Sequence, residues 1–257
     1  MLKIALRIST LAHYKILIFG ASLGILAFLA TGLKAVENEK SPQHLTDARA
    51  LVKNLTHEST QYVHTKNELI VWEGDVVARC DCSGLMNNLL LHSYGYSKDN
   101  LKTWFGHARP KAEHYYQAIA DPAGKGFTRI NQLKDAQPGD LLVVKYAELA
   151  SDKSTGHVML VDGKPTEMPP ALPEVAGSVK QWRVPIIDSS KSGHGKSDTR
   201  YEKGMKHTGV GKGLLRVYTD EKGEVIAYTW SPESKKTVYD RASHPLVIGR
   251  LIPHYKP

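Results

Sequence analysis

Cysteine is scarce in this chain of 257 residues, which contains only Cys80 and Cys82. A single residue separates the two, and that spacing is too short for a relaxed disulfide, so we expect no structural disulfide. The Cys-x-Cys pair is not followed by a second close pair of ligands, which argues against a zinc site built on these thiols. We therefore expect neither a metal nor a cofactor.

The chain also lacks any block of Lys and Arg interleaved with aromatic residues, so we expect no nucleic-acid partner. Internal repeats and low-complexity tracts are missing as well. The net charge of +8 overstates the basicity, because four of the 34 basic residues and none of the 26 acidic ones lie in the first 35 residues. Residues 36–257 are mildly basic, at +4, which suits weak attraction to an anionic wall or membrane surface.

An uncharged apolar run covers residues 16–33, and Lys3, Arg7 and Lys15 precede it. Basic residues before such a run and acidic residues after it send the rest of the chain across a membrane. We expect residues 1–35 to be either a cleaved signal peptide or an N-terminal membrane anchor. The predicted location is the bacterial periplasm or cell envelope, because a cysteine-poor exported chain suits that compartment. If the segment is retained, residues 16–33 are predicted to anchor the chain to the inner membrane.

Hydrophobic periodicity predicts helices first and strands second. Helical spacing of apolar residues occurs in 41–63, in 81–94 and in 110–120, the last within a stretch, 96–130, that we interpret as an insertion. After residue 136, turn residues alternate with short apolar runs, which predict strands at 141–146, 157–162, 182–188, 214–218, 225–230 and 246–252. Residues 164–173 and 189–213 are predicted surface loops. The order predicts one α+β domain, residues 36–257, with N-terminal helices packed on a mostly antiparallel sheet of five to six strands.

The segment Asp81-Cys82-Ser83-Gly84 begins the second predicted helix. Asp81 is placed to cap this helix, and Gly95 is placed to end it. Cys82 falls in the first turn, where unpaired backbone amides and the helix dipole favour a thiolate over a thiol. Gly84 has no side chain and would let a substrate approach. Cys82 is therefore a candidate nucleophile, whereas Cys80 precedes the helix and is predicted to be buried and inert.

Three stretches resemble motifs of the NlpC/P60 peptidases: Asp81 to Leu85, Gln137 to Leu142 and Gly156 to Val161. Those are papain-like enzymes of bacterial envelopes, in which a cysteine attacks a peptide bond of the peptidoglycan stem through a thioester intermediate. The resemblance implies a papain-like fold, with Cys82 as nucleophile and His157 as base and acid. It also implies that Asp188, at the end of the next predicted strand, orients the histidine, and that the substrate is peptidoglycan or a muropeptide.

Further residues take supporting roles in this hypothesis. Tyr62 resembles the tyrosine that precedes the catalytic helix in the family, although the residues after it depart from the family pattern. Ser83 and Gly84 are predicted to support the substrate or the oxyanion. His194 is a rival for the role of Asp188, but its glycine-rich setting predicts an exposed loop. Asp198 and Arg200 are predicted to form a local ion pair, and the remaining histidines, including His57, His64, His92, His107 and His114, are interpreted as surface or packing residues.

Three functions remain open on these observations. The first is a cell-envelope cysteine hydrolase that cleaves amide bonds of peptidoglycan stem peptides. The second keeps the thiol chemistry but acts on acyl chains, as an acyltransferase or lipid amidase, and it predicts a long apolar channel beside Cys82. The third is a non-catalytic wall-binding module with a vestigial site, which predicts an unreactive thiol.

Overall fold

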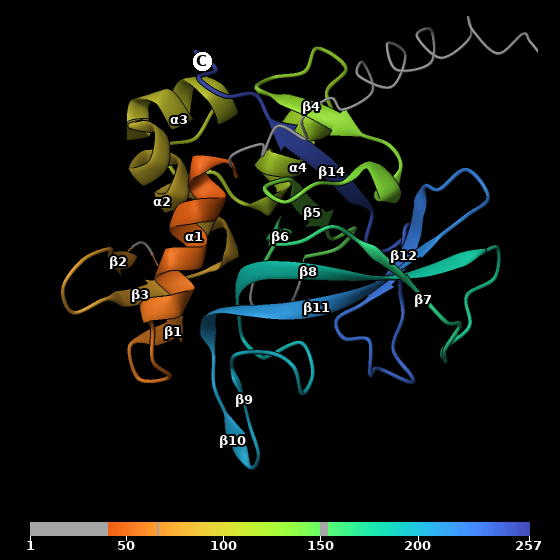
Figure 1. Cartoon of the computed structure of the whole chain (residues 1–257). Coiled ribbons are helices and arrows are strands. Elements are labelled where there is room, and N and C mark those ends of the chain that lie inside the picture. Colours follow the sequence, from red (N-terminus) through yellow and green to blue (C-terminus); the bar gives the residue numbers. More distant parts are fainter. Residues whose placement is uncertain (1–40, 66, 150–153) are drawn as a thin grey trace, which may run out of the picture. The chain divides into compact units, whose positions relative to one another are not determined.

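The main feature of the fold is an antiparallel sheet of nine strands (Figure 1). The computed structural model describes residues 41–257, except 66 and 150–153. The strand order is β13-β12-β11-β8-β6-β5-β14-β4, and β7 pairs with β8. The strands are β4 (Phe127–Ile130), β5 (Leu141–Lys145), β6 (Gly156–Val161), β7 (Thr166–Met168), β8 (Lys180–Ser190), β11 (Gly209–Thr219), β12 (Val225–Thr229), β13 (Tyr239–Asp240) and β14 (Leu246–Leu251).

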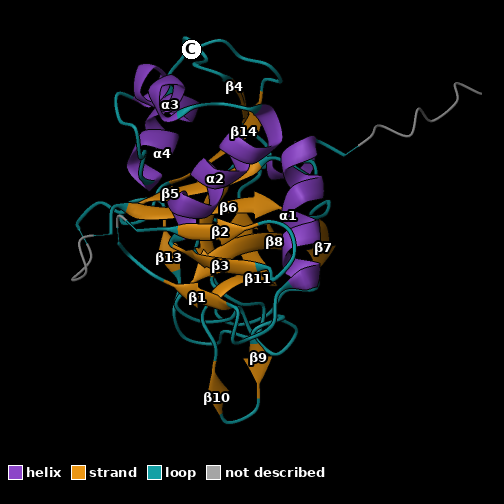
Figure 2. Cartoon of the chain, turned by 90° about the vertical axis from the view of Figure 1, so that its left-hand side faces the viewer, coloured by secondary structure: helices purple, strands orange, loops and turns teal. Residues whose placement is uncertain are grey.

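The helices and a small sheet lie on one side of this large sheet (Figures 1 and 2). The small sheet has the order β1-β3-β2, in which β1 runs parallel to β3. A separate hairpin, β9-β10, projects away from the helices at the bottom of both views. The bounds are α1 (Gln43–Asn54), β1 (Thr60–Tyr62), β2 (Leu69–Val71), β3 (Val77–Cys80), α2 (Cys82–Tyr94), α3 (Lys98–Phe105), α4 (Ala112–Ala120), β9 (Tyr201–Glu202) and β10 (Met205–Lys206), with a short 3-10 turn at Leu133–Asp135.

Strand β5 shows how both faces of the large sheet become buried. Leu141 and Val143 join the apolar cluster that includes helices α1 to α4, whereas Leu142 and Val144 join a second cluster on the opposite face. Side chains alternate between the two faces of a strand, so a strand covered on both sides reads as a continuous apolar run. Burying one such side chain contributes about 1.5–3 kcal/mol to folding. Strand β5 is therefore a stable support for the neighbouring strand β6.

The predicted fold class is wrong. The described residues form fourteen strands and four α-helices, and the main sheet has nine strands rather than five to six, so the fold is mostly β and not the papain-like arrangement. Some of the extra strands arise in stretches predicted to be loops, and β1 arises within the predicted helix 41–63. Strand β7 lies within 164–173, and the end of β8, the β9-β10 hairpin and the start of β11 occupy 189–213.

The stretch 96–130, interpreted as an insertion, contributes to the main sheet and to the core. Its last strand, β4, pairs with β14, and Trp104, Tyr115 and Phe127 belong to the cluster beneath the helices. Aromatic side chains bury large areas, which explains why this segment packs inward.

Local predictions were more accurate than the global one. Five of the six predicted strands appear within two residues of their expected bounds, and the sixth, β11, begins five residues before its predicted start. Helix α2 begins directly after Asp81 and ends before Gly95, its C-cap, whose φ of 68° is left-handed. Helix α1 has Pro42 as its N-cap, and no side chain bonds there. Two predictions fall on residues outside this description: the signal or anchor in 1–35 and its cleavage. Among the residues described, no helix has both the length and the apolar character needed to cross a membrane.

Candidate active site

Cys82 is the first residue of α2, and Asp81 caps the helix. One carboxylate oxygen of Asp81, Oδ1, accepts a hydrogen bond from the Gly84 amide at 2.7 Å and from the Ser83 hydroxyl at 2.9 Å. The thiol-bearing residue is 5% exposed, which keeps it dry while leaving a narrow approach. Both predicted supporting residues, Ser83 and Gly84, thus donate to the cap rather than towards a substrate.

A charged group behind the cap explains why residue 84 must be glycine. Arg109 donates to Asp81 Oδ2 at 2.6 Å and to Glu68 Oε1 at 2.5 Å. A Cβ atom on residue 84 would lie 1.8 Å from Glu68 Oε1. The missing side chain therefore makes room for Glu68, whereas the sequence had predicted that it makes room for substrate. Burial raises the pKa of the Glu68 carboxyl, although its hydrogen bond and ion pair with Arg109 oppose the shift.

His157 on β6 and Asp188 on β8 meet across neighbouring strands. The distance from His157 Nε2 to Asp188 Oδ2 is 2.6 Å, and Asp188 is fully buried. Burial by itself lowers the pKa of His157, but the charge of Cys82 and hydrogen bonds to Asp188 and Cys82 outweigh it and raise that pKa to about 10. Since Nε2 is bonded to Asp188, the other ring nitrogen, Nδ1, is left for Cys82. The structure therefore brings Cys82, His157 and Asp188 together.

Asp188 is held by two further side chains from the segment that follows it. His194 Nε2 lies 2.9 Å from Asp188 Oδ2, and Arg200 donates to Asp188 Oδ1 at 2.8 Å. Burial tends to raise the pKa of Asp188, but the charges of Arg200 and His194 hold it well below the usual range. The predicted ion pair of Arg200 with Asp198 is also present, at 2.8 Å. We call Asp188, His157, His194, Asp198 and Arg200 the Asp188 cluster.

The prediction of an exposed His194 is wrong, because the side chain is 3% exposed. Its Nδ1 lies 2.8 Å from the Trp230 carbonyl oxygen, and its backbone amide donates to Asp198 Oδ2 at 2.8 Å. Both ring partners of His194, a carbonyl and a carboxylate, only accept hydrogen bonds, so the ring must carry two protons to make both. His194 is consequently a second support for Asp188 rather than a replacement for it.

Alternating glycines on β11 create the space for the Asp188 cluster. A Cβ on Gly211 would lie 2.7 Å from Arg200 Nε, and one on Gly213 would lie 2.4 Å from Asp198 Oδ2 and 2.8 Å from His194 Cβ. The two positions share one face of the strand, since side chains alternate. The glycines of 189–213 had suggested a loop. Two of them instead lie on β11, where they leave room for the buried polar side chains that pack against this strand.

Two hollows that share lining residues adjoin the imidazole and the thiol. The larger has a volume of about 230 Å³ and reaches His157, Lys191 and Trp230, while a small one reaches Cys82 and Lys111. Tyr62, Ser154 and Gly156 border both hollows. Tyr62, which the family resemblance had implied for the site, therefore borders both hollows, and the Lys191 ammonium sits 5.7 Å from the centre of its ring.

Trp230, the first residue after β12, was missed by sequence reasoning. Its ring meets that of His157 edge to face, with ring centres 5.2 Å apart, while its carbonyl oxygen is the partner of His194. An indole in that position shields the bond between His157 and Asp188 from water. Only its place at the end of a predicted strand could have suggested it, and that is a weak signal.

Comparisons with known proteins give one informative relative. The chain is 34% identical over 223 residues to the uncharacterized protein R653 of Acanthamoeba polyphaga mimivirus, an alignment that spans 82% of this chain and 96% of the viral protein. No family model matches the chain, and no solved structure matches it either.

Proposed function

We propose that this chain, which belongs to the same family as the uncharacterized mimivirus protein, is a cysteine hydrolase that cleaves amide bonds of peptidoglycan stem peptides. The observation that carries the proposal is the placement of Cys82 at a helix N-terminus beside His157, whose other nitrogen is 2.6 Å from the buried Asp188. A charged nucleophile and a histidine that can donate a proton are what acyl transfer requires.

The chemistry follows from the two ring nitrogens of His157. The Cys82 thiolate attacks the carbonyl carbon of the scissile amide, and the carbonyl oxygen becomes an oxyanion near the Cys82 backbone amide, which has no acceptor within the helix. His157 gives its proton to the leaving nitrogen, which departs as an amine and leaves a thioester. The neutral imidazole then takes a proton from water, the hydroxide attacks the thioester, and release of the carboxylate restores the thiolate.

Asp188 acts as a positioning residue in this scheme. Its bond to Nε2 keeps a proton on that atom, so Nδ1 is the nitrogen that exchanges a proton with the thiol and the leaving group. Arg200 and His194 keep Asp188 negatively charged throughout the cycle, because they share its two oxygens.

The lining of the larger hollow supports a peptide rather than an acyl chain. Polar side chains border it, including Ser154, Lys191 and Ser192, and its volume of about 230 Å³ is small. Lys111 borders the small hollow together with Cys82, and Lys191 borders the larger hollow together with His157, so each hollow has a positive charge that suits the carboxylates of a stem peptide. We propose the bacterial periplasm or cell envelope as the place of the reaction, on the strength of the apolar run 16–33.

Digestion of purified muropeptides, followed by mass spectrometry, tests the proposal. The wild-type chain should release shortened peptides, and Cys82→Ala should release none. Cys80→Ala is the matched control, since Cys80 lies two residues away, is fully buried and accordingly has a pKa raised by burial. Full activity of Cys82→Ala, or equal losses in both variants, would contradict the proposed role of the thiol.

A further inference from the structure

A second cluster of histidines and a carboxylate lies at the base of the β9-β10 hairpin, away from Cys82. His57 follows α1, Glu202 ends β9, and His207 follows β10. One ligand atom from each residue lies within 4.8 Å of the other two. Glu202 Oε2 is 3.4 Å from His57 Nδ1 and 2.7 Å from His207 Nε2. We call these three residues the Glu202 cluster.

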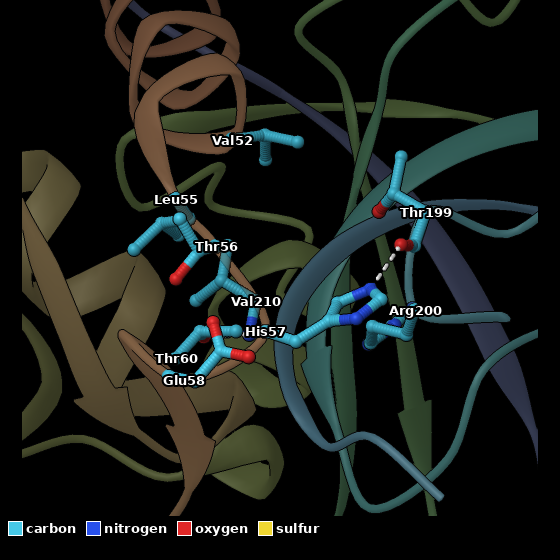
Figure 3. Close-up of a pocket in the computed structure, with 9 residues that line it drawn as sticks. All are labelled: Val52, Leu55, Thr56, His57, Glu58, Thr60, Thr199, Arg200 and Val210. Carbon is cyan, nitrogen blue, oxygen red and sulfur yellow. Dashed lines mark hydrogen bonds between the residues drawn. The ribbon is translucent and has the colours of Figure 1, made fainter. Parts of the chain in front are cut away.

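The hydrogen bonds of His57 direct a lone pair at Glu202. Its Nε2 lies 3.0 Å from the Thr199 carbonyl oxygen, which only accepts, so Nε2 must carry the proton (Figure 3). In the neutral ring, Nδ1 then presents its lone pair to the Glu202 carboxylate, and two acceptors face each other. The His57 and His207 rings also stack, with centres 3.7 Å apart. The ring nitrogens and the carboxylate oxygen therefore converge on one point, as metal ligands do.

We propose that His57, Glu202 and His207 bind a single zinc ion. Zinc binds imidazole nitrogen and carboxylate oxygen at about 2.0–2.2 Å, so tetrahedral ligands lie about 3.3 Å apart. The two separations from Glu202 are 2.7 and 3.4 Å, and the third is within 4.8 Å, so small side-chain movements would bring the three ligands into place. Two imidazoles and one carboxylate suit zinc better than calcium or magnesium, which prefer oxygen ligands. The bond from His57 Nε2 to Thr199 is the kind of outer contact that orients a metal-binding histidine. Water would fill the fourth position.

The bound ion would fasten a loosely packed part of the molecule. His57 and Thr199 border a cavity of about 350 Å³ between the end of α1 and the segment that carries Arg200 (Figure 3). Arg200 in turn pairs with Asp188, so the ion would tie the α1–β1 connection to the chain segment that supports the Asp188 cluster. The zinc site stands on its own geometry and does not depend on the proposed hydrolase activity.

Zinc titration of the untagged full-length chain, stripped of metal and held in a mild detergent, tests the site. We expect one molar equivalent to bind and to raise the midpoint of thermal unfolding. Removing a ligand should weaken binding by at least about 100-fold in His207→Ala and Glu202→Gln, since loss of an outer contact already costs 10–100-fold. The matched control is His92→Ala, because His92 is exposed and stacks on Trp72. Circular dichroism checks that each variant is folded.

Cobalt substitution separates this site from the thiols. Co²⁺ held by nitrogen and oxygen should show visible bands without the near-ultraviolet charge transfer of a cobalt–sulfur bond, and Cys82→Ala should leave the spectrum unchanged. Three results would overturn the zinc site: no stoichiometric binding, equal binding by His207→Ala and wild type, or loss of binding in Cys82→Ala. In the first two cases the Glu202 cluster is a proton-sharing ion pair, and in the third the thiol is the ligand.

Discussion

Two carboxylates in this protein each meet two histidines, but they differ in burial and in charge compensation. Asp188 is fully buried and also pairs with Arg200, whereas the side chain of Glu202 is 51% exposed and has no arginine among its ion-pair partners in the described residues. Taking a carboxylate out of water is costly unless cations surround it. In the Asp188 cluster the compensating positive charge comes from the Arg200 side chain, whereas the Glu202 cluster can bind a cation from solution.

The largest expected difference between the clusters concerns catalysis. Asp188→Asn should lower the rate of muropeptide cleavage by about 10⁴-fold, because an amide cannot hold His157 in the required tautomer. Glu202→Gln should leave the rate of the zinc-free protein unchanged. Initial rates measured by mass spectrometry compare the two, and a similar loss in both variants would mean that the clusters are not functionally separate.

The next difference concerns stability. Arg200→Met should destabilise the fold by about 3–5 kcal/mol, because it leaves Asp188 and Asp198 buried without their cation. His207→Ala without zinc should cost less than about 1 kcal/mol, as is usual for exposed ion pairs. Urea unfolding at neutral pH measures both free energies. Equal costs would contradict the contrast in burial.

A smaller cost is expected from filling the space beside the Asp188 cluster. Gly213→Ala should destabilise the protein by about 1–3 kcal/mol, since the added carbon would press on Asp198 and His194. Gly163→Ala is a milder control, because its Cβ would be 3.2 Å from Pro185, a tight but non-polar contact. If Gly213→Ala were as stable as the wild type, the glycines of β11 would not be needed for packing the cluster.

The pH dependence of stability sharpens the comparison further. His157 has a raised pKa, so its contribution is fully present below its ordinary pKa of about 6.5 and is lost as pH rises through about 10. Asp188 has a lowered pKa, so its contribution is present above about pH 3.9 and is lost as pH falls towards the folded-state value. Unfolding free energies at several pH values should show the alkaline loss in wild type and not in His157→Gln. Parallel profiles would contradict the coupling to Cys82 and Asp188.

Sequence reasoning located the Cys82 side of the site better than the Asp188 side, for a physical reason. The capping of α2 is local, so Asp81 and Gly95 could be recognised within the helix itself. The contacts of His194 and Arg200 are made by a segment rich in Gly, Ser and Lys, which local propensity describes as a loop. The glycines at every second position of 209–213 are a local sign of a strand with polar groups against it, but the stretch 189–213 was predicted to be a loop.

Local sequence patterns could predict neither the global fold nor the Glu202 cluster. Strand β8 is longer than its apolar run, and short strands such as β7, β9 and β13 depend on a neighbour for their hydrogen bonds. His57 and Glu202 are distant in sequence and meet only because the base of the β9-β10 hairpin lies beside the connection between α1 and β1. Such pairings follow from tertiary structure, and no residue spacing predicts them.

The reactivity of Cys82 tests the central claim most directly. Iodoacetamide should label Cys82 rapidly at pH 6, because Cys82 lies beside His157 at the start of a helix, and His157→Ala should abolish that labelling while Cys80 stays unlabelled in both proteins. Peptide mapping of the alkylated chain identifies the modified residue and its rate. Slow labelling of Cys82 at pH 6, or labelling that does not depend on His157, would contradict a thiolate held by this histidine.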